Sequence, residues 1–250
     1  MTATLMYHSI DDSGSPISVS AASFEKHLRW LSDGSVRTAP LETLATRRDA
    51  AGDTVAVTFD DGFANTKHAL EQLIDHGITP TGFVVTGQVG LTNAWRGQAQ
   101  RGIPTLPLLG WQDLEELLKR GVRIEAHTRS HPRLTRVTEA EAADELAGSR
   151  EDLRARLGVH SAHIAYPYGN VNAAVARQAA GSFSAGHTTR FHVLTATDDA
   201  MRLPRLDMYY FRAAGSLDTW GRPSFARRLA WIRAKRRIRE RLMDGVEEKE

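Results

Sequence analysis

One apolar stretch limits the folds open to this chain more than any other. Residues Thr54–Phe59 (TVAVTF) are apolar or β-branched throughout and end in Asp60-Asp61-Gly62. A run without a polar face is typical of a strand buried on both sides, as in parallel sheets covered by helices. Two carboxylates at the end of such a strand are costly unless a positive group meets them. The stretch therefore predicts both an α/β fold and a site.

Strand-like and helix-like segments alternate along the chain. Seven short apolar runs predict strands, and longer amphipathic segments between them predict helices. The predicted strands are Thr4–Tyr7, Thr54–Phe59, Gly82–Thr86, Val122–Ala126, Ala162–Tyr166, Phe183–Gly186 and Leu203–Met208. This alternation indicates a parallel sheet, which can be a closed barrel or an open sheet, and periodicity alone does not separate the two.

A second polar cluster follows another predicted strand. His127 and His131 come after Val122–Ala126, and the proline that follows them favours a loop over one continuous helix. Two imidazoles four residues apart can converge on one cation. Each cluster alone is also typical of a turn or of surface polar residues. Together they offer one carboxylate and two imidazoles as ligands, with a second carboxylate left as a base, which is the pattern of an open catalytic metal site.

Three stretches together carry a family resemblance. They are Thr58-Phe59-Asp60-Asp61-Gly62, His127-Thr128-Arg129-Ser130-His131-Pro132 and, in part, Ala165-Tyr166-Pro167-Tyr168-Gly169. In order and spacing they resemble the three motifs of the polysaccharide deacetylases of carbohydrate esterase family 4, the NodB homology type. The Tyr-His-Ser sequence near the start is similar to the exopolysaccharide-synthesis branch of that family.

The resemblance implies a fold and an activity. The fold is a distorted (β/α) barrel of seven or eight parallel strands. The activity is removal of an N-acetyl group from an N-acetylated sugar, in a polysaccharide, oligosaccharide or glycoconjugate. We expect Asp61, His127 and His131 to hold a divalent metal, Zn²⁺ first among them, and Asp60 to act as the general base.

The third motif departs from the family pattern. The resemblance implies that the backbone N–H of Tyr168 stabilises an oxyanion and that Pro167 lies at the substrate. Where the family carries an arginine, this chain has Ala165. We hypothesise that Arg205, from another strand, fills that space. The alternative is an ordinary surface salt bridge with Asp207.

The general acid of the family is missing from its usual place. The family supplies it from a histidine in a late Leu-x-His motif, which this chain lacks. His187 and His192 lie in that part of the sequence without the surrounding motif. His8 follows a predicted strand and so belongs on the same rim as the other site residues. We expect His8 in the site, with a capping or hydrogen-bonding role as the alternative.

Basic residues gather near the C-terminus. Although the net charge is only +2, the segment from Arg227 to Arg241 holds eight basic residues and one acid, so the rest of the chain is net acidic. We expect a barrel in residues 1–221 and a basic helical tail in residues 222–250. The tail is either a solvated helix packed on the barrel or a contact with an anionic membrane, to which Trp231 adds an apolar anchor. Nucleic acid is not expected, because no recognition motif is present.

Composition adds further limits. The chain has no cysteine, which excludes disulfides and thiolate metal sites. Neither a signal peptide nor a membrane-spanning segment is predicted, which favours the cytoplasm, with a shortened chain as the alternative.

Two other functions stay open: hydrolysis of a non-sugar amide, and a catalytically inactive relative that binds carbohydrate or metal. Retention of Asp60 argues against the inactive relative, because binding needs only the ligands.

Overall fold

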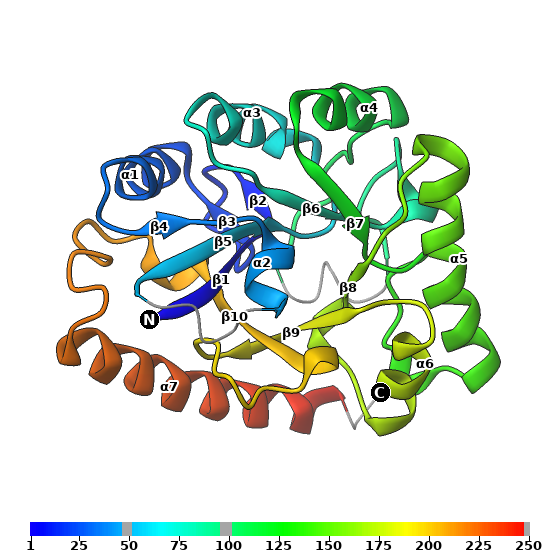
Figure 1. The fold of residues 1–250 in the computed structure, drawn as a ribbon. Coiled ribbons are helices and arrows are strands. Elements are labelled where there is room, and N and C mark those ends of the chain that lie inside the picture. Colours follow the sequence, from blue (N-terminus) through cyan, green and yellow to red (C-terminus); the bar gives the residue numbers. More distant parts are fainter. Residues whose placement is uncertain (47–51, 96–101, 248–250) are drawn as a thin grey trace.

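Seven parallel strands form a closed barrel in the computed structural model, which describes residues 1–46, 52–95 and 102–247, the last eleven by backbone alone. The strands are β1 (Thr2–Tyr7), β5 (Thr54–Phe59), β6 (Thr81–Val84), β7 (Arg123–Ala126), β8 (His163–Ala165), β9 (Ala185–Phe191) and β10 (Leu203–Asp207). Each of the seven predicted strands has a counterpart among them. Figure 1 shows the strands at the centre and the helices outside them.

Pairing between the first and second barrel strands closes the ring. The order of neighbours is β1, β10, β9, β8, β7, β6 and β5, and β5 pairs back with β1 from Thr2 opposite Thr54 to Tyr7 opposite Phe59. All seven pairings are parallel. The predicted (β/α) barrel is therefore confirmed, with seven strands. A short strand, β4 (Arg37–Thr38), pairs with the start of β5 beside the ring.

Helices cover the outside of the barrel. They are α1 (Ala21–Ser32), α2 (Leu41–Thr46), α3 (Lys67–Asp75), α4 (Trp111–Arg120), α5 (Glu139–Leu157), α6 (Ala173–Ala180) and α7 (Pro223–Glu247). A two-stranded pair, β2 (Ser9–Ile10) and β3 (Ser18–Val19), follows β1. Strand β5 is buried on both faces, as predicted, and so is β1: every residue of these two strands is buried.

Strand β9 differs from its prediction. The predicted strand ended at Gly186, but β9 continues through Thr188, Thr189 and Arg190 to Phe191. Its pairing with β10 shifts register within this polar part: Leu203 lies opposite His187, whereas Arg205 lies opposite Phe191. The irregularity explains the error, because a bulged strand loses the simple apolar pattern from which strands are predicted.

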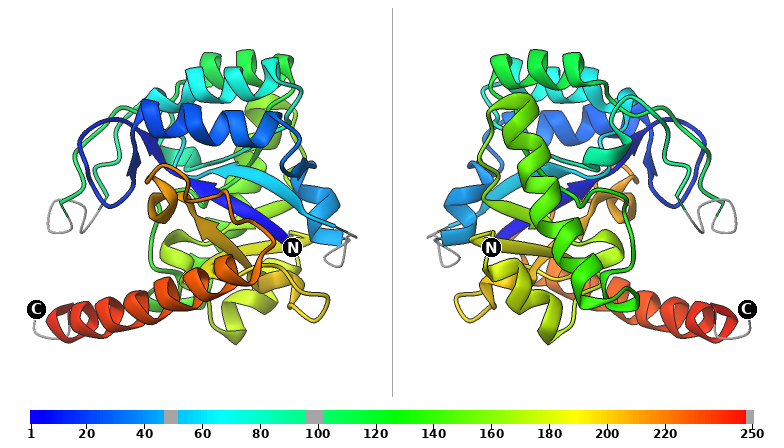
Figure 2. Two further views of the ribbon diagram at one scale, coloured as in Figure 1. Left: turned by 90° about the vertical axis from the view of Figure 1, so that its left-hand side faces the viewer. Right: turned by 90° about the vertical axis from the view of Figure 1, so that its right-hand side faces the viewer.

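Helix α7 packs its apolar stripe on the barrel. Phe225, Leu229 and Ile232 are buried in the main hydrophobic core. Figure 2 shows the helix lying along the barrel and its C-terminal part extending past it. No helix in the described part of the chain has both the length and the apolar character needed to span a bilayer. The predicted boundary between residues 221 and 222 stays a prediction.

Candidate active site

Two neighbouring strands bring the first site residues to one rim of the barrel. Tyr7 and Phe59 are paired at the ends of β1 and β5, so His8 and Asp60 follow side by side. The backbone N–H of Asp60 donates to the carbonyl oxygen of Tyr7 at 2.9 Å. Nε2 of His8 lies 3.9 Å from Oδ2 of Asp60. The structure therefore brings His8 to Asp60, at the carboxyl ends of the strands where barrels of this kind carry their sites.

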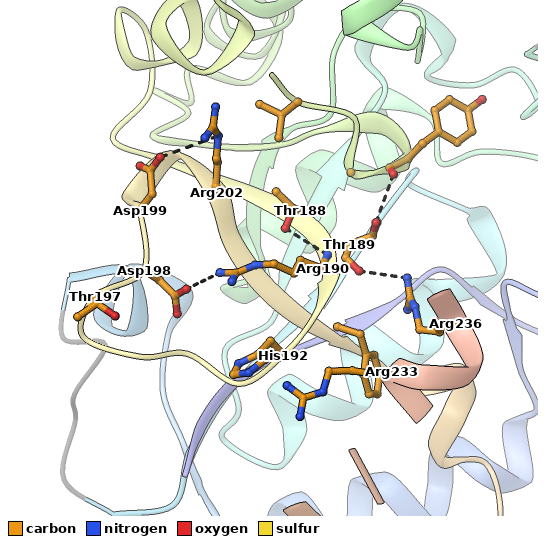
Figure 3. A pocket seen from close by; sticks show the side chains of 14 residues that line it. Thr188, Thr189, Arg190, His192, Thr197, Asp198, Asp199, Arg202, Arg233 and Arg236 are labelled. Carbon is orange, nitrogen blue, oxygen red and sulfur yellow. Dashed lines mark hydrogen bonds and ion pairs between the residues drawn. The ribbon is translucent and has the colours of Figure 1, made fainter. Parts of the chain in front are cut away.

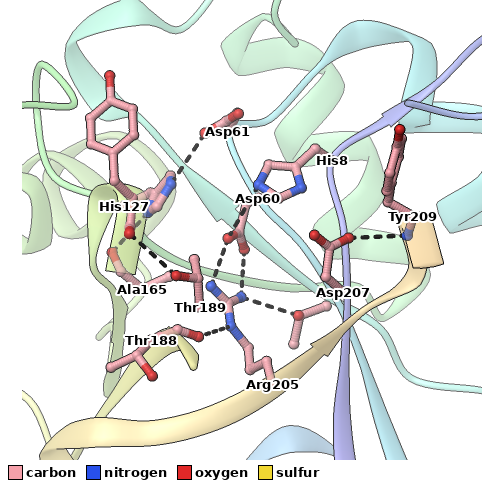
Figure 4. Close-up of polar contacts among 12 residues, drawn as sticks. His8, Asp60, Asp61, His127, Ala165, Thr188, Thr189, Arg205, Asp207 and Tyr209 are labelled. Carbon is pink, nitrogen blue, oxygen red and sulfur yellow. Dashed lines mark hydrogen bonds and ion pairs between the residues drawn. The ribbon is translucent and has the colours of Figure 1, made fainter. Parts of the chain in front are cut away.

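Arg205 and Asp60 form a buried, bidentate ion pair. Nη1 of Arg205 donates to Oδ1 of Asp60 and Nη2 to Oδ2, both at 2.7 Å. The arginine side chain is fully buried and that of Asp60 is 2% exposed. Two further acceptors fix the guanidinium: Nε donates to the carbonyl oxygen of Thr188, and Nη1 to Oγ1 of Thr58. Figure 4 shows this fork, and Arg205 is thus not part of a surface salt bridge.

This pair keeps Asp60 ionised. Burial alone would raise the pKa of the carboxyl group, but the charge and hydrogen bonds of Arg205, together with the nearby histidines, outweigh burial, and the pKa lies below its ordinary value. A carboxylate has about four acceptor positions. The guanidinium of Arg205 occupies one acceptor position on each oxygen of Asp60. The carboxylate can therefore still accept a proton or a further hydrogen bond.

Asp61, His127 and His131 form a compact, buried cluster. One ligand atom of each lies within 4.8 Å of the others. Oδ1 of Asp61 is 3.2 Å from Nε2 of His127 and 3.3 Å from Nε2 of His131. Tetrahedral zinc with bonds of about 2.0–2.1 Å holds its ligand atoms roughly 3.3 Å apart. The distances from Oδ1 of Asp61 to the two imidazole nitrogens therefore fit a metal of this kind.

The surroundings of the cluster also fit a metal. Nδ1 of His127 lies 2.7 Å from the carbonyl oxygen of Ala165, to which it donates, and this leaves the lone pair of Nε2 directed at Asp61. No described residue hydrogen-bonds to Oδ1 of Asp61 with acceptable geometry, although the atom is buried. An orphaned carboxylate oxygen between two imidazole nitrogens is the arrangement that a cation completes.

Unusual backbone conformations gather at this site. Among the described residues, four non-glycine residues have positive φ: Asp61 (71°), Thr128 (66°), His131 (61°) and Tyr168 (59°). Left-handed conformations are unfavourable for such residues and persist where the surroundings enforce them. All four lie in the three sequence motifs, which is the distribution expected when the backbone is bent to aim side chains or N–H groups at a ligand.

Helix α5 anchors the loop that carries both histidines. Nε and Nη2 of Arg129 each donate to Asp152 at 3.0 Å, and Nη1 donates to Asp144 at 3.1 Å. Glu145 accepts the backbone N–H groups of Arg129 and Ser130 at 2.8 and 2.9 Å. These contacts tie a loop of strained conformation to a long, regular helix.

Aromatic side chains enclose the cluster. The ring of Tyr168 meets the ring of His131 edge to face, with centroids 4.6 Å apart. The indole of Trp95 stacks on the ring of His131, with centroids 4.5 Å apart. Pro167 is buried at the start of the short turn Pro167–Gly169. Trp95 was not predicted as a site residue, because the sequence around it has no periodic pattern from which its position could be inferred.

The two late histidines lie elsewhere. His187 is fully buried inside the barrel, where its Nε2 is 3.0 Å from Nδ1 of His163. His192 follows β9 and lines a separate cavity. Neither His187 nor His192 lies beside Asp60 as His8 does.

Comparison with known proteins identifies the family. The model of the polysaccharide deacetylase family matches residues 47–184, more than half of the chain. The chain belongs to this family, so the predicted family is confirmed. YxkH of Bacillus subtilis (strain 168), named as a polysaccharide deacetylase, is 29% identical over 173 residues, which are 67% of this chain and 57% of YxkH. The chain thus spans little more than half the length of this relative.

Solved structures share the fold over most of both chains. IcaB from Ammonifex degensii superposes with a TM-score of 0.72 and 25% identity, over 93% of this chain and 97% of IcaB. The deacetylase PplD of Streptococcus pyogenes, solved with acetate, superposes with a TM-score of 0.71 and 23% identity, over 82% of this chain and 91% of PplD.

Proposed function

We propose that this protein is a metal-dependent hydrolase that removes the N-acetyl group from an N-acetylated sugar. The family provides the reaction class. The observation that carries the proposal is the pairing of two carboxylates with different roles. Asp61 belongs to a three-ligand cluster, whereas Asp60, its neighbour, is held by Arg205. A protein that only bound metal or sugar would not need the second, separately held carboxylate.

Asp61, His127 and His131 are the proposed metal ligands. A divalent cation bound there, Zn²⁺ by its preference for this donor set, supplies a Lewis acid and lowers the pKa of bound water towards about 7. Nδ1 of His127 stays protonated because the carbonyl oxygen of Ala165 accepts its hydrogen bond. The imidazole is therefore fixed in the tautomer that offers Nε2 as a ligand.

Asp60 is the proposed general base. It takes the proton of the attacking water, while Arg205 keeps the carboxylate ionised and turned towards the site. The backbone N–H of Tyr168 is the proposed donor to the oxyanion of the tetrahedral intermediate. His8, beside Asp60, is the proposed general acid that protonates the leaving amine. Trp95, Tyr168 and Pro167 are proposed to enclose the acetylated sugar.

The exchange of Asp60 for Asn tests the proposal. Asp60→Asn keeps the shape of the side chain but removes its basicity. We expect wild type and variant to bind equal amounts of Zn²⁺, and only wild type to release acetate from substrates that contain N-acetylglucosamine. Asp12→Asn, at an exposed carboxylate after β2, is the matched control and should match wild type. Acetate release by Asp60→Asn at the wild-type rate would refute the assigned base.

The same measurements distinguish the proposal from the two alternatives that the sequence left open. A hydrolase of non-sugar amides would bind metal and release nothing from the sugar substrates, yet would cleave a small amide in an Asp60-dependent manner. An inactive relative would bind metal or sugar and cleave neither. Contact of α7 with an anionic membrane stays a prediction, which sedimentation with anionic vesicles at low and high salt tests.

A further inference from the structure

A cavity lies beside the candidate active site, outside the barrel wall. Its volume is about 840 Å³, within the usual range for small-ligand sites. Strand β9, the connection from β9 to β10, and helix α7 line it, as Figure 3 shows. Four arginines contribute to the lining: Arg190, Arg202, Arg233 and Arg236. This number of guanidinium groups around one cavity favours an anionic ligand.

Carboxylates of the cavity wall neutralise two of the four arginines, and Asp207, outside the lining, lies 3.7 Å from a third, Arg236. Arg190 is hydrogen-bonded to Asp198, and Arg202 lies 3.9 Å from Asp199. Both carboxylates also accept backbone N–H groups of their own connection, Asp198 from Thr195 and Asp199 from Met201. They are thus engaged in the fold of this segment. Among the described residues, the uncompensated positive charge of the cavity therefore comes from Arg233 of α7.

The two arginines of α7 have different surroundings. Nη2 of Arg236 donates to the carbonyl oxygen of Thr189 at 3.1 Å, and Nη1 lies 3.7 Å from Oδ2 of Asp207. The guanidinium also lies 5.4 Å from the ring centre of Phe191, so its position is fixed and its charge is compensated. Arg233 lies one helical turn earlier and is partly buried. No hydrogen bond or ion pair joins its guanidinium to any residue in the described part of the chain. Arg233 is therefore available to a ligand.

The cavity and the candidate active site share a wall. Tyr168, whose ring contacts His131, also lines the cavity. The hydroxyl of Thr189 donates to the carbonyl oxygen of Tyr168 at 3.2 Å. Next to it, the carbonyl oxygen of Thr188 accepts the hydrogen bond from Nε of Arg205, which holds Asp60. A ligand in the cavity would thus lie one side chain away from the proposed sugar site.

We propose that this cavity binds an anionic group, a phosphate or a carboxylate, that the N-acetylated substrate carries next to the sugar to be deacetylated. The inference rests on the proposed function for the identity of the sugar. Arginine suits this role because its planar fork binds two oxygens of a phosphate or carboxylate at once. The proposal also gives Arg233 and Arg236 of α7 a role, which packing of the apolar stripe of this helix does not require.

Direct binding tests the anion site without any catalysis. Titration calorimetry with inorganic pyrophosphate, and separately with glucuronate, would use wild type, Arg233→Ala and Arg227→Ala. Arg227 is an exposed arginine of the same helix outside the cavity, so its exchange removes the same charge. We expect Arg233→Ala to weaken binding by about tenfold or more, and Arg227→Ala to leave it nearly unchanged. Equal affinity of all three proteins, or no binding by wild type, would overturn the proposal.

Catalysis then tests the connection to the substrate. Three substrates share N-acetylglucosamine: a neutral methyl glycoside, the same sugar with a pyrophosphate at its anomeric carbon, and a disaccharide with glucuronic acid. We expect Arg233→Ala to lower kcat/KM about tenfold for one charged substrate, which identifies the anion as phosphate or carboxylate, and to leave the neutral one unchanged. An equal effect on all three contradicts the proposal. If wild type deacetylates none of them, the proposed function fails, and the binding measurement alone decides the anion site.

Discussion

At the scale of single residues, Arg205 is the side chain on which the proposed base depends. Arg205→Ala would leave the carboxylate of Asp60 buried without its counter-charge. Breaking one side of a buried pair costs about 3–5 kcal/mol of unfolding free energy. We expect this loss in urea unfolding, together with a large fall in the rate of acetate release, while the Zn²⁺ content stays near that of wild type, because none of the proposed ligands is changed.

A surface arginine provides the control for this variant. Arg154 pairs with Glu151, and both side chains are 55% exposed. Arg154→Ala should change stability by less than about 1 kcal/mol and leave turnover intact. Unchanged turnover in Arg205→Ala would remove Arg205 from the site.

The same residues show how far the sequence predicts the site. Asp60, Asp61, His127 and His131 could be found because each follows a strand that its own apolar pattern predicts. Arg205 could be offered only as a hypothesis, since its reach across the barrel to Asp60 depends on strand order. The carbonyl acceptors and the four left-handed residues could not be found, because backbone geometry at a strand end is set by the assembled barrel.

At the scale of elements, α5 positions the loop with the two histidine ligands. Asp152 accepts from Nε and Nη2 of Arg129 and from the hydroxyl of Thr86, and its side chain is 28% exposed. Asp152→Ala removes all three hydrogen bonds and lets the loop leave its strained conformation. We expect the affinity for Zn²⁺ to fall by about tenfold, as for other outer partners of metal ligands, in a competition titration with a chelator.

Asp144 provides a comparison within the same cluster. Among the described residues, it accepts only from Nη1 of Arg129, and its side chain is 70% exposed. Asp144→Ala should therefore leave the affinity for Zn²⁺ close to that of wild type. Equal losses of Zn²⁺ affinity in the Asp152 and Asp144 variants would contradict this prediction. They would show that the affinity depends on negative charge near the histidine loop and not on the attachment of this loop to α5.

Element prediction succeeded where one pattern governed a whole segment. The buried strands β1 and β5 were found because all their residues are buried. Strand β9 was placed too early because its second half is polar and bulged around the backbone group that Arg205 needs. The second half of β9 lacks the apolar pattern of a strand because its backbone accepts a hydrogen bond from Arg205 of β10. A contact between two strands of this kind cannot be predicted from the local sequence.

At the scale of the whole molecule, closure of the barrel creates the site. The ring closes through pairing of β1 with β5, and this pairing sets His8 beside Asp60. Periodicity could not separate this barrel from an open sheet, because both have the same alternation of strands and helices. The closed barrel could be predicted only from the family resemblance, because closure depends on pairing between strands that are distant in the sequence.

The barrel interior also makes the stability of the whole fold dependent on pH. His163 and His187 are buried and hydrogen-bonded to each other. Burial lowers the pKa of both, that of His187 well below its ordinary value, with the charges of His163 and Arg205 acting in the same direction. In the unfolded chain each titrates near 6.5. As the pH falls below about 6.5, the unfolded state takes up protons that the folded state does not, so stability is lost, by up to about 1.4 kcal/mol per pH unit for each histidine.

Thermal or urea unfolding between pH 7.5 and 5.5 measures this dependence. We expect the stability of His187→Gln to fall less steeply over this range than that of wild type, because the variant has one fewer buried group to protonate. His160→Gln, at an exposed histidine, should retain the wild-type slope. All three proteins keep His127 and His131, so protonation at the proposed metal site affects them equally, and the difference in slope belongs to the pair inside the barrel. Identical slopes in the two variants would place the acid sensitivity of the fold elsewhere.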